Sequence, residues 1–170
     1  MHQDKLGREL FEQKTNAADF AAELEQHCNW ITCVPDSIFK RVLPAFHEWH
    51  FAPRENHAVA MAFGARLAGK RPAVLLQNSG LGLCLDALLG TFVLYKQGLL
   101  LIVSNRGVLP WEEIQHSDWG KITNSLLQAA EIPQISFDSE GLIGLKRAIR
   151  LVQENNQVVA LVMQRGNLDE

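Results

Sequence analysis

The 170-residue sequence has only three cysteines, and they match neither a disulfide framework nor a metal site. Cys28, Cys33 and Cys84 are odd in number and show no C-x-x-C spacing and no cysteine–histidine ligand pattern. We therefore expect buried, reduced thiols in a cytoplasmic protein, with a redox or substrate-facing role for Cys84 as the alternative.

Long apolar runs and blocks of like charge are also missing. The longest apolar stretch, residues 87–104, is interrupted by Tyr-Lys-Gln-Gly at 95–98, which indicates helix, turn and buried strand instead of a membrane span. The polar first residues predict no signal peptide. Sixteen Lys and Arg against nineteen Asp and Glu give a net charge of −3, without any like-charge run of five. We expect neither a nucleic-acid nor a membrane partner.

The composition that remains is that of one ordinary globular domain. Hydrophobic residues make up 47% of the sequence and charged residues 21%. A chain of this length buries roughly 70% of its unfolded surface, which is enough for an independent core. We predict a polar tail over residues 1–14 and a single domain over residues 15–170.

Short apolar runs alternate with segments of helical periodicity along that domain. Strands are predicted at 29–34, 48–52, 73–77, 99–104, 135–137 and 158–163. Helices are predicted at 16–28, 37–43, 58–68, 81–96, 119–130 and 139–154. Regular alternation indicates an α/β fold, a three-layer α/β/α sandwich with a central, mostly parallel sheet.

Ligands of such folds bind beyond the carboxyl ends of the strands. Four polar or turn-forming segments follow predicted strands, and we expect them to meet at one edge of the sheet. They are Pro35-Asp36-Ser37, Arg54-Glu55-Asn56, Gln77-Asn78-Ser79-Gly80 and Ser104-Asn105-Arg106-Gly107.

Glu55 opens a helix that is almost purely small and apolar. A carboxylate in a first turn is most simply a partner of the helix dipole. A helix this apolar is expected to be buried, however, and a carboxylate that loses solvent at its edge holds a proton more readily. Ala58, Ala62 and Ala65 add a small-residue stripe that permits close approach of another helix or subunit.

In the segment Asn-Ser-Gly-Leu-Gly at 78–82, the first three residues are predicted to form a tight turn from a strand into the helix that begins near Leu81. The glycines let a ligand approach the backbone, and the free amides of a helix start favour anions. Neither nucleotide-binding glycine fingerprint is present, so a Rossmann enzyme is not indicated. Ser79 lacks the G-x-S-x-G elbow of a hydrolase nucleophile.

His116 lies in the longest predicted loop, 105–118, where a histidine is most simply solvated. The remaining histidines show no paired ligand spacing, so no metal ligand is predicted in this chain.

Three segments together carry a resemblance that no one of them carries alone. They are 54–64 (RENHAVAMAFG), 67–72 (LAGKRP) and 77–82 (QNSGLG), and they are similar to the pyrimidine-binding domain of thiamine diphosphate enzymes. The nearest kin are the phosphonopyruvate and sulfopyruvate decarboxylases. Val34-Pro35-Asp36-Ser37, Arg106-Gly107 and Gln115-His116 continue the match, which spans residues 17–165.

The resemblance implies a cofactor and roles for particular residues. Glu55 matches the glutamate that hydrogen-bonds the aminopyrimidine of thiamine diphosphate and so promotes loss of the thiazolium C2 proton. Catalysis would fall to Glu55 and His116. Cofactor binding would fall to Glu55, Pro35, Asn78, Ser79 and Gly80, and substrate binding to Asp36, Ser37, Asn78, Ser79 and His116.

The resemblance also implies a second chain. The family holds its diphosphate through Mg²⁺ with a Gly-Asp-Gly motif on another domain, and no glycine here precedes an aspartate. We expect a hetero-oligomer in which a β subunit supplies that domain. The expected reaction is that of a carboxy-lyase acting on a small anionic 2-oxo acid. Phosphonopyruvate is the first expectation, because of the Gln115-His116 pairing, and sulfopyruvate is the alternative. The remaining alternative is that the chain is a non-catalytic α/β assembly module.

Overall fold

A six-stranded, wholly parallel sheet forms the centre of the chain, in the order β2-β1-β3-β4-β6-β5. The computed structural model describes residues 14–169, so the predicted tail of residues 1–14 lies, apart from Lys14, outside the described residues. The strands are β1 (Trp30–Cys33), β2 (His50–Phe51), β3 (Pro72–Gln77), β4 (Leu99–Ser104), β5 (Gln134–Ser136) and β6 (Val158–Met163). The predicted strand positions are confirmed to within a few residues.

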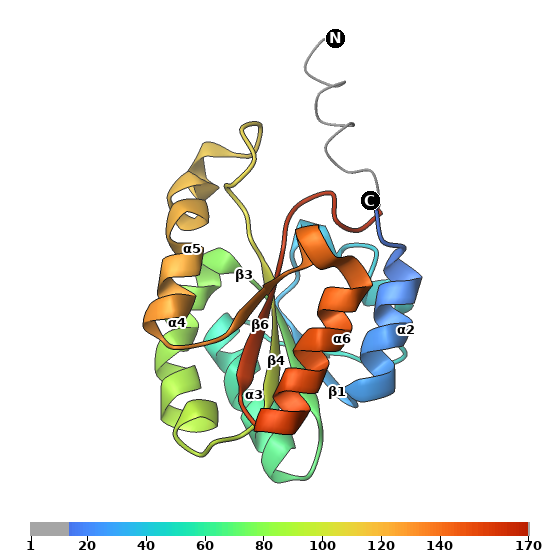
Figure 1. Ribbon diagram of the computed structural model, residues 1–170, viewed down its shortest axis with the longest axis vertical. Coiled ribbons are helices and arrows are strands. Elements are labelled where there is room, and N and C mark those ends of the chain that lie inside the picture. The colour runs from blue at the N-terminus through green and yellow to red at the C-terminus, as the bar shows by residue number, and fades with distance from the viewer. Residues whose placement is uncertain (1–13, 170) are drawn as a thin grey trace.

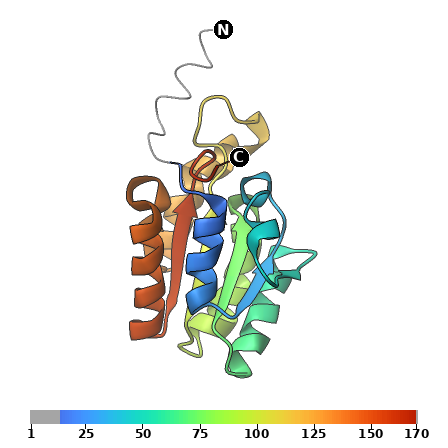
Figure 2. The same cartoon turned by 90° about the vertical axis from the view of Figure 1, so that its right-hand side faces the viewer.

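Helices cover both faces of this sheet, which confirms the three-layer α/β fold (Figures 1 and 2). The helices are α2 (Ala17–His27), α3 (Glu55–Leu67), α4 (Asn78–Leu88), α5 (Ser117–Ala129) and α6 (Phe137–Asn155). Helices α2 and α6 pack on one face of the sheet, and α3, α4 and α5 pack on the other. Every connection between neighbouring parallel strands therefore crosses one of these faces.

Each face of the sheet has its own apolar core, because successive side chains of a strand point to opposite faces. Leu100 and Ile102 of β4 join the core beneath α2 and α6, whereas Leu101 and Val103 join the core beneath α3, α4 and α5. All six residues of β4 are buried. Within the described residues, no helix has both the length and the apolar character needed to cross a membrane.

The helix predicted over 37–43 is wrong. Two short 3₁₀ turns stand there instead, η1 (Ser37–Phe39) and η2 (Leu43–Ala45). Asp36 caps the first turn, since its Oδ1 accepts a hydrogen bond from the amide of Ile38 at 2.9 Å. Pro44 has no amide to donate to a continuing helix and sits at the start of the second turn, where that loss costs nothing.

One further expectation about helices needs correction. The predicted turn at 78–80 is the first turn of α4, which begins directly after β3 and continues into a π-helical turn, η3 (Leu89–Val93). The small-residue stripe of α3 permits the close approach of another helix, as expected. Ala58 and Ala62 are fully buried in the core that α3 shares with α4 and the sheet.

Candidate active site

The four segments that follow β1, β2, β3 and β4 meet at the carboxyl edge of the sheet, as predicted. The hydroxyl of Ser104 donates to Asp36 Oδ1 at 2.9 Å, which joins the ends of β4 and β1. Asn78 Nδ2 donates to Asn105 Oδ1 at 3.0 Å, which joins the ends of β3 and β4. The start of α3 completes the edge, because the side chain of Glu55 reaches the first turn of α4.

Glu55 lies directly against Gly80. A Cβ at residue 80 would stand 2.1 Å from Cδ of Glu55 and 2.5 Å from its Oε1, far inside contact distance. Any residue larger than glycine would displace the carboxylate. Gly80 is fully buried in α4, so its role is to leave room for Glu55.

A pocket of about 470 Å³ opens where Glu55 meets Gly80, and its other lining residues are Arg54, Ser79, Gly82, Leu83 and Trp119. Glu55 is the first residue of α3, and Gly80 is in the first turn of α4. The carboxylate of Glu55 therefore lies beside the starts of two helices. The pocket thus places the half-buried carboxylate of Glu55, a hydrogen-bond acceptor, beside the backbone of Gly80.

His116 is not simply solvated. Gln77 Nε2 donates to the hydroxyl of Ser79 at 2.9 Å and lies 3.1 Å from Nδ1 of His116. With Gln77 as the donor, Nδ1 accepts and the imidazole carries its proton on Nε2. Gln77 thus fixes Ser79 and His116 together, and Ser79 keeps its own hydroxyl proton for donation.

Asn78 is fully buried, and its amide nitrogen is occupied within the chain. Besides Asn105, its acceptors are the backbone oxygen of Arg106 and the hydroxyl of Thr123, both at 2.9 Å. Its Oδ1 has no hydrogen-bond partner among the described residues. Asn78 therefore joins α4, the end of β4 and α5 into one rigid edge.

A buried arginine holds the segment that follows β1. The side chains of Arg106 and Asp36 are each 5% exposed, and their Nη1 and Oδ2 are 3.5 Å apart. Nη1 also donates to the hydroxyl of Ser37 at 2.8 Å. Burial acts to lower the pKa of Arg106, but a hydrogen bond to Glu112 and the charges of Asp36, Glu112 and Glu113 together raise it.

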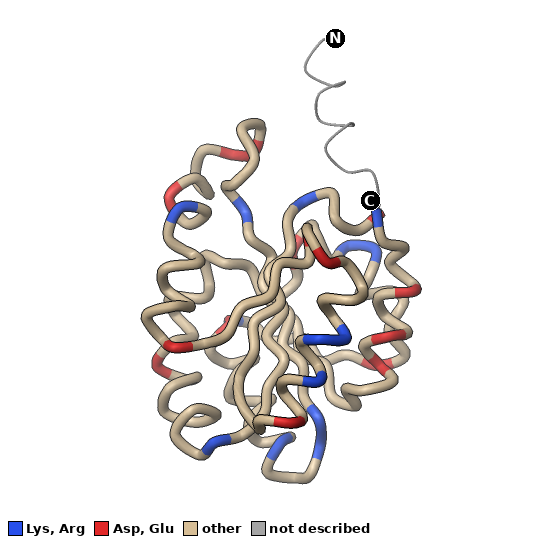
Figure 3. The backbone as a smooth tube through the Cα atoms, viewed as in Figure 1, with Lys and Arg blue, Asp and Glu red and all other residues tan. Residues whose placement is uncertain are grey.

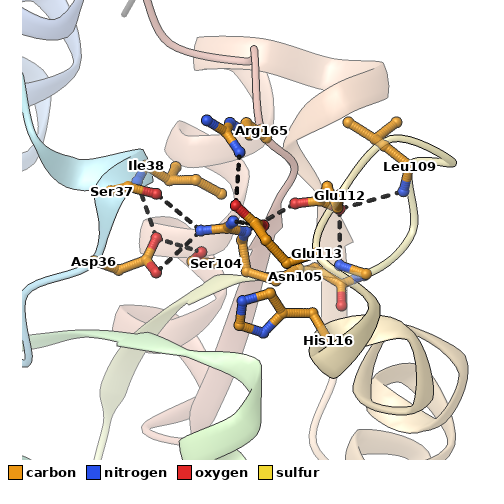
Figure 4. Close-up of polar contacts among 12 residues, drawn as sticks. Asp36, Ser37, Ile38, Ser104, Asn105, Leu109, Glu112, Glu113, His116 and Arg165 are labelled. Atoms are coloured by element: carbon orange, nitrogen blue, oxygen red, sulfur yellow. Dashed lines mark hydrogen bonds and ion pairs between the residues drawn. The ribbon is translucent and has the colours of Figure 1, made fainter.

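Glu112 folds the loop that carries His116 (Figure 4). Its side chain is 1% exposed, and its Oε1 accepts from Arg106 Nε at 2.8 Å. Its Oε2 accepts from the amides of Gly107 at 2.7 Å and Leu109 at 3.2 Å. One buried carboxylate therefore closes the loop onto its own stem.

Glu113 extends this network toward solvent. It accepts from Arg106 Nη2 at 2.7 Å and lies 3.8 Å from Nη1 of Arg165, whose guanidinium stacks over Trp111. A hydrogen bond from its own backbone amide lowers the pKa of Glu113, and the charges of Arg106 and Arg165 act in the same direction against burial.

Two glycines let the loop cross α5 closely. Gly107 has φ 86°, and a Cβ there would stand 1.9 Å from the backbone oxygen of His116. A Cβ at Gly120 would stand 2.4 Å from the backbone of Gly107. This crossing places His116 at the entrance of α5, above the end of β3.

The remaining candidates lie around this centre. Pro35 and Ser37 are exposed at the end of β1, on the side of Arg106. Cys84 is buried beneath Glu55, where burial raises the pKa of its thiol to about 12 and the charge of Glu55 adds to the effect. The thiol is protonated and packs as a small apolar side chain.

Five residues at this edge were not assigned by the sequence: Gln77, Arg106, Glu112, Glu113 and Trp119. Gln77 and Arg106 stand inside the motifs that carry the family resemblance, which was the available signal. Nothing in the sequence distinguishes the buried Glu112 from a solvated glutamate, since its burial depends on how the loop folds.

This fold is that of thiamine diphosphate enzymes. A thiamin diphosphate-dependent enzyme of Mycobacterium smegmatis superposes with a TM-score of 0.69 at 18% identity, over 93% of this chain and 32% of the other. Benzoylformate decarboxylase of Polynucleobacter necessarius superposes with a TM-score of 0.69 at 16% identity, over 93% of this chain and 31% of the other. The chain thus spans about a third of each of these structures.

The particular family follows from curated relatives. The sulfopyruvate decarboxylase subunit alpha of Methanococcus maripaludis is 33% identical over 70% of this chain and 74% of its own length. The corresponding subunit of Methanocaldococcus jannaschii is 32% identical over 68% of this chain and 72% of its own length. No protein-family model matches the sequence. The chain belongs to the family of sulfopyruvate decarboxylase alpha subunits, as the resemblance implied.

Proposed function

We propose that this chain is the alpha subunit of a thiamine diphosphate-dependent sulfopyruvate decarboxylase, which converts sulfopyruvate to sulfoacetaldehyde and carbon dioxide. The observation that carries the proposal is the close contact between the side chain of Glu55 and Gly80. A pure scaffold has no need to keep a carboxylate in a place that only glycine leaves open. The names of the relatives favour sulfopyruvate over phosphonopyruvate, the first expectation from the sequence.

The residues present fit the pyrimidine end of the cofactor. Glu55 supplies the acceptor, Gly80 leaves the backbone open beside it, and Ser79 supplies a hydroxyl in the same pocket of about 470 Å³. Thiamine diphosphate, when bound, supplies the electron sink that decarboxylation of a 2-oxo acid requires. The part of this chain is to hold a proton at the carboxylate of Glu55, and the partner chain would close the open pocket to water.

Among the predicted substrate residues, we assign direct contact to Ser79 and His116. Ser79 keeps a hydroxyl proton, and His116 keeps its Nε2–H, because Gln77 occupies the other atom of each. Nε2 is suited to donate a proton or to meet a negative group. Asp36 and Asn78 contribute by holding the edge rigid, because the carboxylate of Asp36 and the amide nitrogen of Asn78 are engaged within the chain. Pro35 and Ser37 line the outer side of the same edge.

A separate beta subunit would bring the diphosphate and Mg²⁺ site. Two observations support this part of the proposal. The sequence has no Gly-Asp-Gly motif, and the described residues offer no cluster of His, Cys, Asp or Glu that could hold a metal ion. The active site would then lie between the two chains in a hetero-oligomer.

Replacing Glu55 with Gln in the reconstituted two-chain enzyme tests the proposal. We expect turnover of sulfopyruvate to fall at least about 100-fold, since the amide cannot take up the proton that the carboxylate holds. Glu48→Gln, at an exposed carboxylate seven residues upstream, is the matched control and should leave turnover unchanged. Full activity in Glu55→Gln would contradict the mechanism and favour a non-catalytic module.

The choice of substrate needs its own comparison. We expect kcat/KM for sulfopyruvate to exceed that for phosphonopyruvate by at least about tenfold with the same preparation. The opposite order would assign the enzyme to phosphonopyruvate and leave the role of Glu55 intact.

A further inference from the structure

A second candidate binding site lies at the amino edge of the sheet, at the other end of the molecule from Glu55. Arg66 is in the last turn of α3 and Glu55 in the first, so the helix alone separates them by roughly 17 Å. The site is a cavity of about 170 Å³ between α3, α6 and the starts of β3 and β4. One water needs roughly 15 Å³ by the same measure, so a small organic molecule fits.

Two guanidinium groups line this cavity, and both are bonded to neutral oxygens. Arg66 donates through Nε to Gln97 Oε1 at 3.0 Å and through Nη2 to Asn156 Oδ1 at 2.9 Å. Arg71 donates through Nε to the backbone oxygen of His27 at 2.6 Å. In residues 14–169 neither arginine forms an ion pair with a carboxylate.

The acidic residues nearest to this edge are engaged elsewhere or point to solvent. Glu23 of α2 pairs with His27 at 3.4 Å and with Lys146 at 3.3 Å. Glu154, in the last turn of α6, is exposed and forms no ion pair with Arg66 or Arg71. Figure 3 shows several Lys and Arg positions at this lower end of the chain. The positive charge of the cavity is therefore not neutralised from within the described chain.

The rest of the lining is apolar. Leu100, Ile149 and Val152 contribute side chains, and Gly98 keeps the floor open, since a Cβ there would lie 3.0 Å from Val152 Cγ1. Asn156 holds the segment before β4 in place, because its Oδ1 also accepts a hydrogen bond from the amide of Gly98 at 3.0 Å. The cavity thus combines the half-buried Arg66 and the exposed Arg71, each held by hydrogen bonds, with a short apolar wall.

We propose that this cavity binds a small organic oxyanion, with its charged group on Arg66 and Arg71 and a short carbon chain against Ile149 and Val152. Guanidinium groups recognise phosphonate, sulfonate and carboxylate oxygens through paired hydrogen bonds. Binding here requires neither turnover nor a partner subunit, so its failure leaves the proposed decarboxylase function untouched, and the reverse also holds.

Titration of the full chain with propylphosphonate, followed by calorimetry at constant ionic strength in chloride, tests the proposal. We expect saturable binding, several-fold tighter than that of inorganic phosphate because of the apolar wall. Arg71→Gln should weaken it at least about tenfold, which is the loss typical of one charge-assisted hydrogen bond. Lys70→Gln removes the same charge from an exposed neighbour outside the cavity and should change affinity less than about twofold.

Two further variants decide where a bound anion sits. Arg66→Gln should also weaken binding. Because Arg66 also holds Asn156 and Gln97, the melting temperature of this variant is measured to show that it is folded. His116→Ala, at the opposite edge, should leave binding unchanged. The proposal is overturned if propylphosphonate does not saturate, if Lys70→Gln and Arg71→Gln weaken binding equally, or if His116→Ala alone abolishes it.

Discussion

Gly80→Ala is expected to impair the function of this chain while leaving its fold intact. The new Cβ would stand 2.1 Å from Cδ of Glu55, and ordinary contact begins at 3.4 Å, so the carboxylate must retreat by at least 1.3 Å. The atoms that collide are the end of a flexible, half-buried side chain that borders an open pocket. Glu55 can therefore turn away while the backbone of both helices stays in place.

The expected magnitudes differ sharply for stability and activity. Alanine is favoured over glycine inside a helix by about 0.5–1 kcal/mol, which offsets much of the cost of moving Glu55. The free energy of unfolding of Gly80→Ala should thus stay within about 1 kcal/mol of the wild type. A displacement of about 1 Å at a reacting group can lower the rate about 100-fold, and we expect a loss of that size in kcat.

Two measurements check this prediction: urea unfolding of the chain, and sulfopyruvate turnover by the reconstituted enzyme. Gly64→Ala is the matched control, because a Cβ on that helical glycine meets nothing within 4 Å. It should raise stability slightly and leave turnover unchanged. If Gly80→Ala keeps wild-type kcat, Glu55 does not act from its place beside Gly80. If Gly80→Ala unfolds the chain, the contact is structural.

Two further predictions concern buried groups. Glu112→Gln should lower the free energy of unfolding by about 2–3 kcal/mol, because the buried Arg106 loses one of its charged partners. Urea titration measures this loss. A loss below about 0.5 kcal/mol would contradict the role of Glu112 in the loop. Burial raises the pKa of Cys28 and of Cys84 to about 12, so both thiols stay protonated at pH 8. A thiol reagent should therefore label neither in the native chain and both in urea, and rapid stoichiometric labelling of the native chain would show that they are accessible.

Most of the sheet could be predicted because it depends on local pattern. The strands 73–77, 99–104 and 158–163 are apolar on both faces, and all three are buried strands of the parallel sheet. The segment 37–43 could not be predicted, because its apolar spacing suits a helix. There a side-chain cap at Asp36 and the missing amide of Pro44 outweigh that spacing.

The site was only partly predictable, for a related reason. Glu55, Ser79 and His116 stand in recognisable motifs, and the rule for parallel sheets brings them to one edge. Their partners are set by contacts across the fold. Gln77 reaches 39 residues along the chain to His116, and Glu55 rests on Gly80 from another helix. No local pattern carries such pairings.

Arg106 shows why position at the carboxyl edge does not by itself make an anion site. A buried arginine beside the strand ends would be the natural ligand for a sulfonate. Three carboxylates already surround it, those of Asp36, Glu112 and Glu113, and Arg165 is a further cation in the network. Freeing the guanidinium for substrate would break a buried ion pair, which costs about 3–5 kcal/mol. The negative group of the proposed substrate is therefore better met by Nε2 of His116, which Arg106 serves by holding the loop, or by residues of the partner chain.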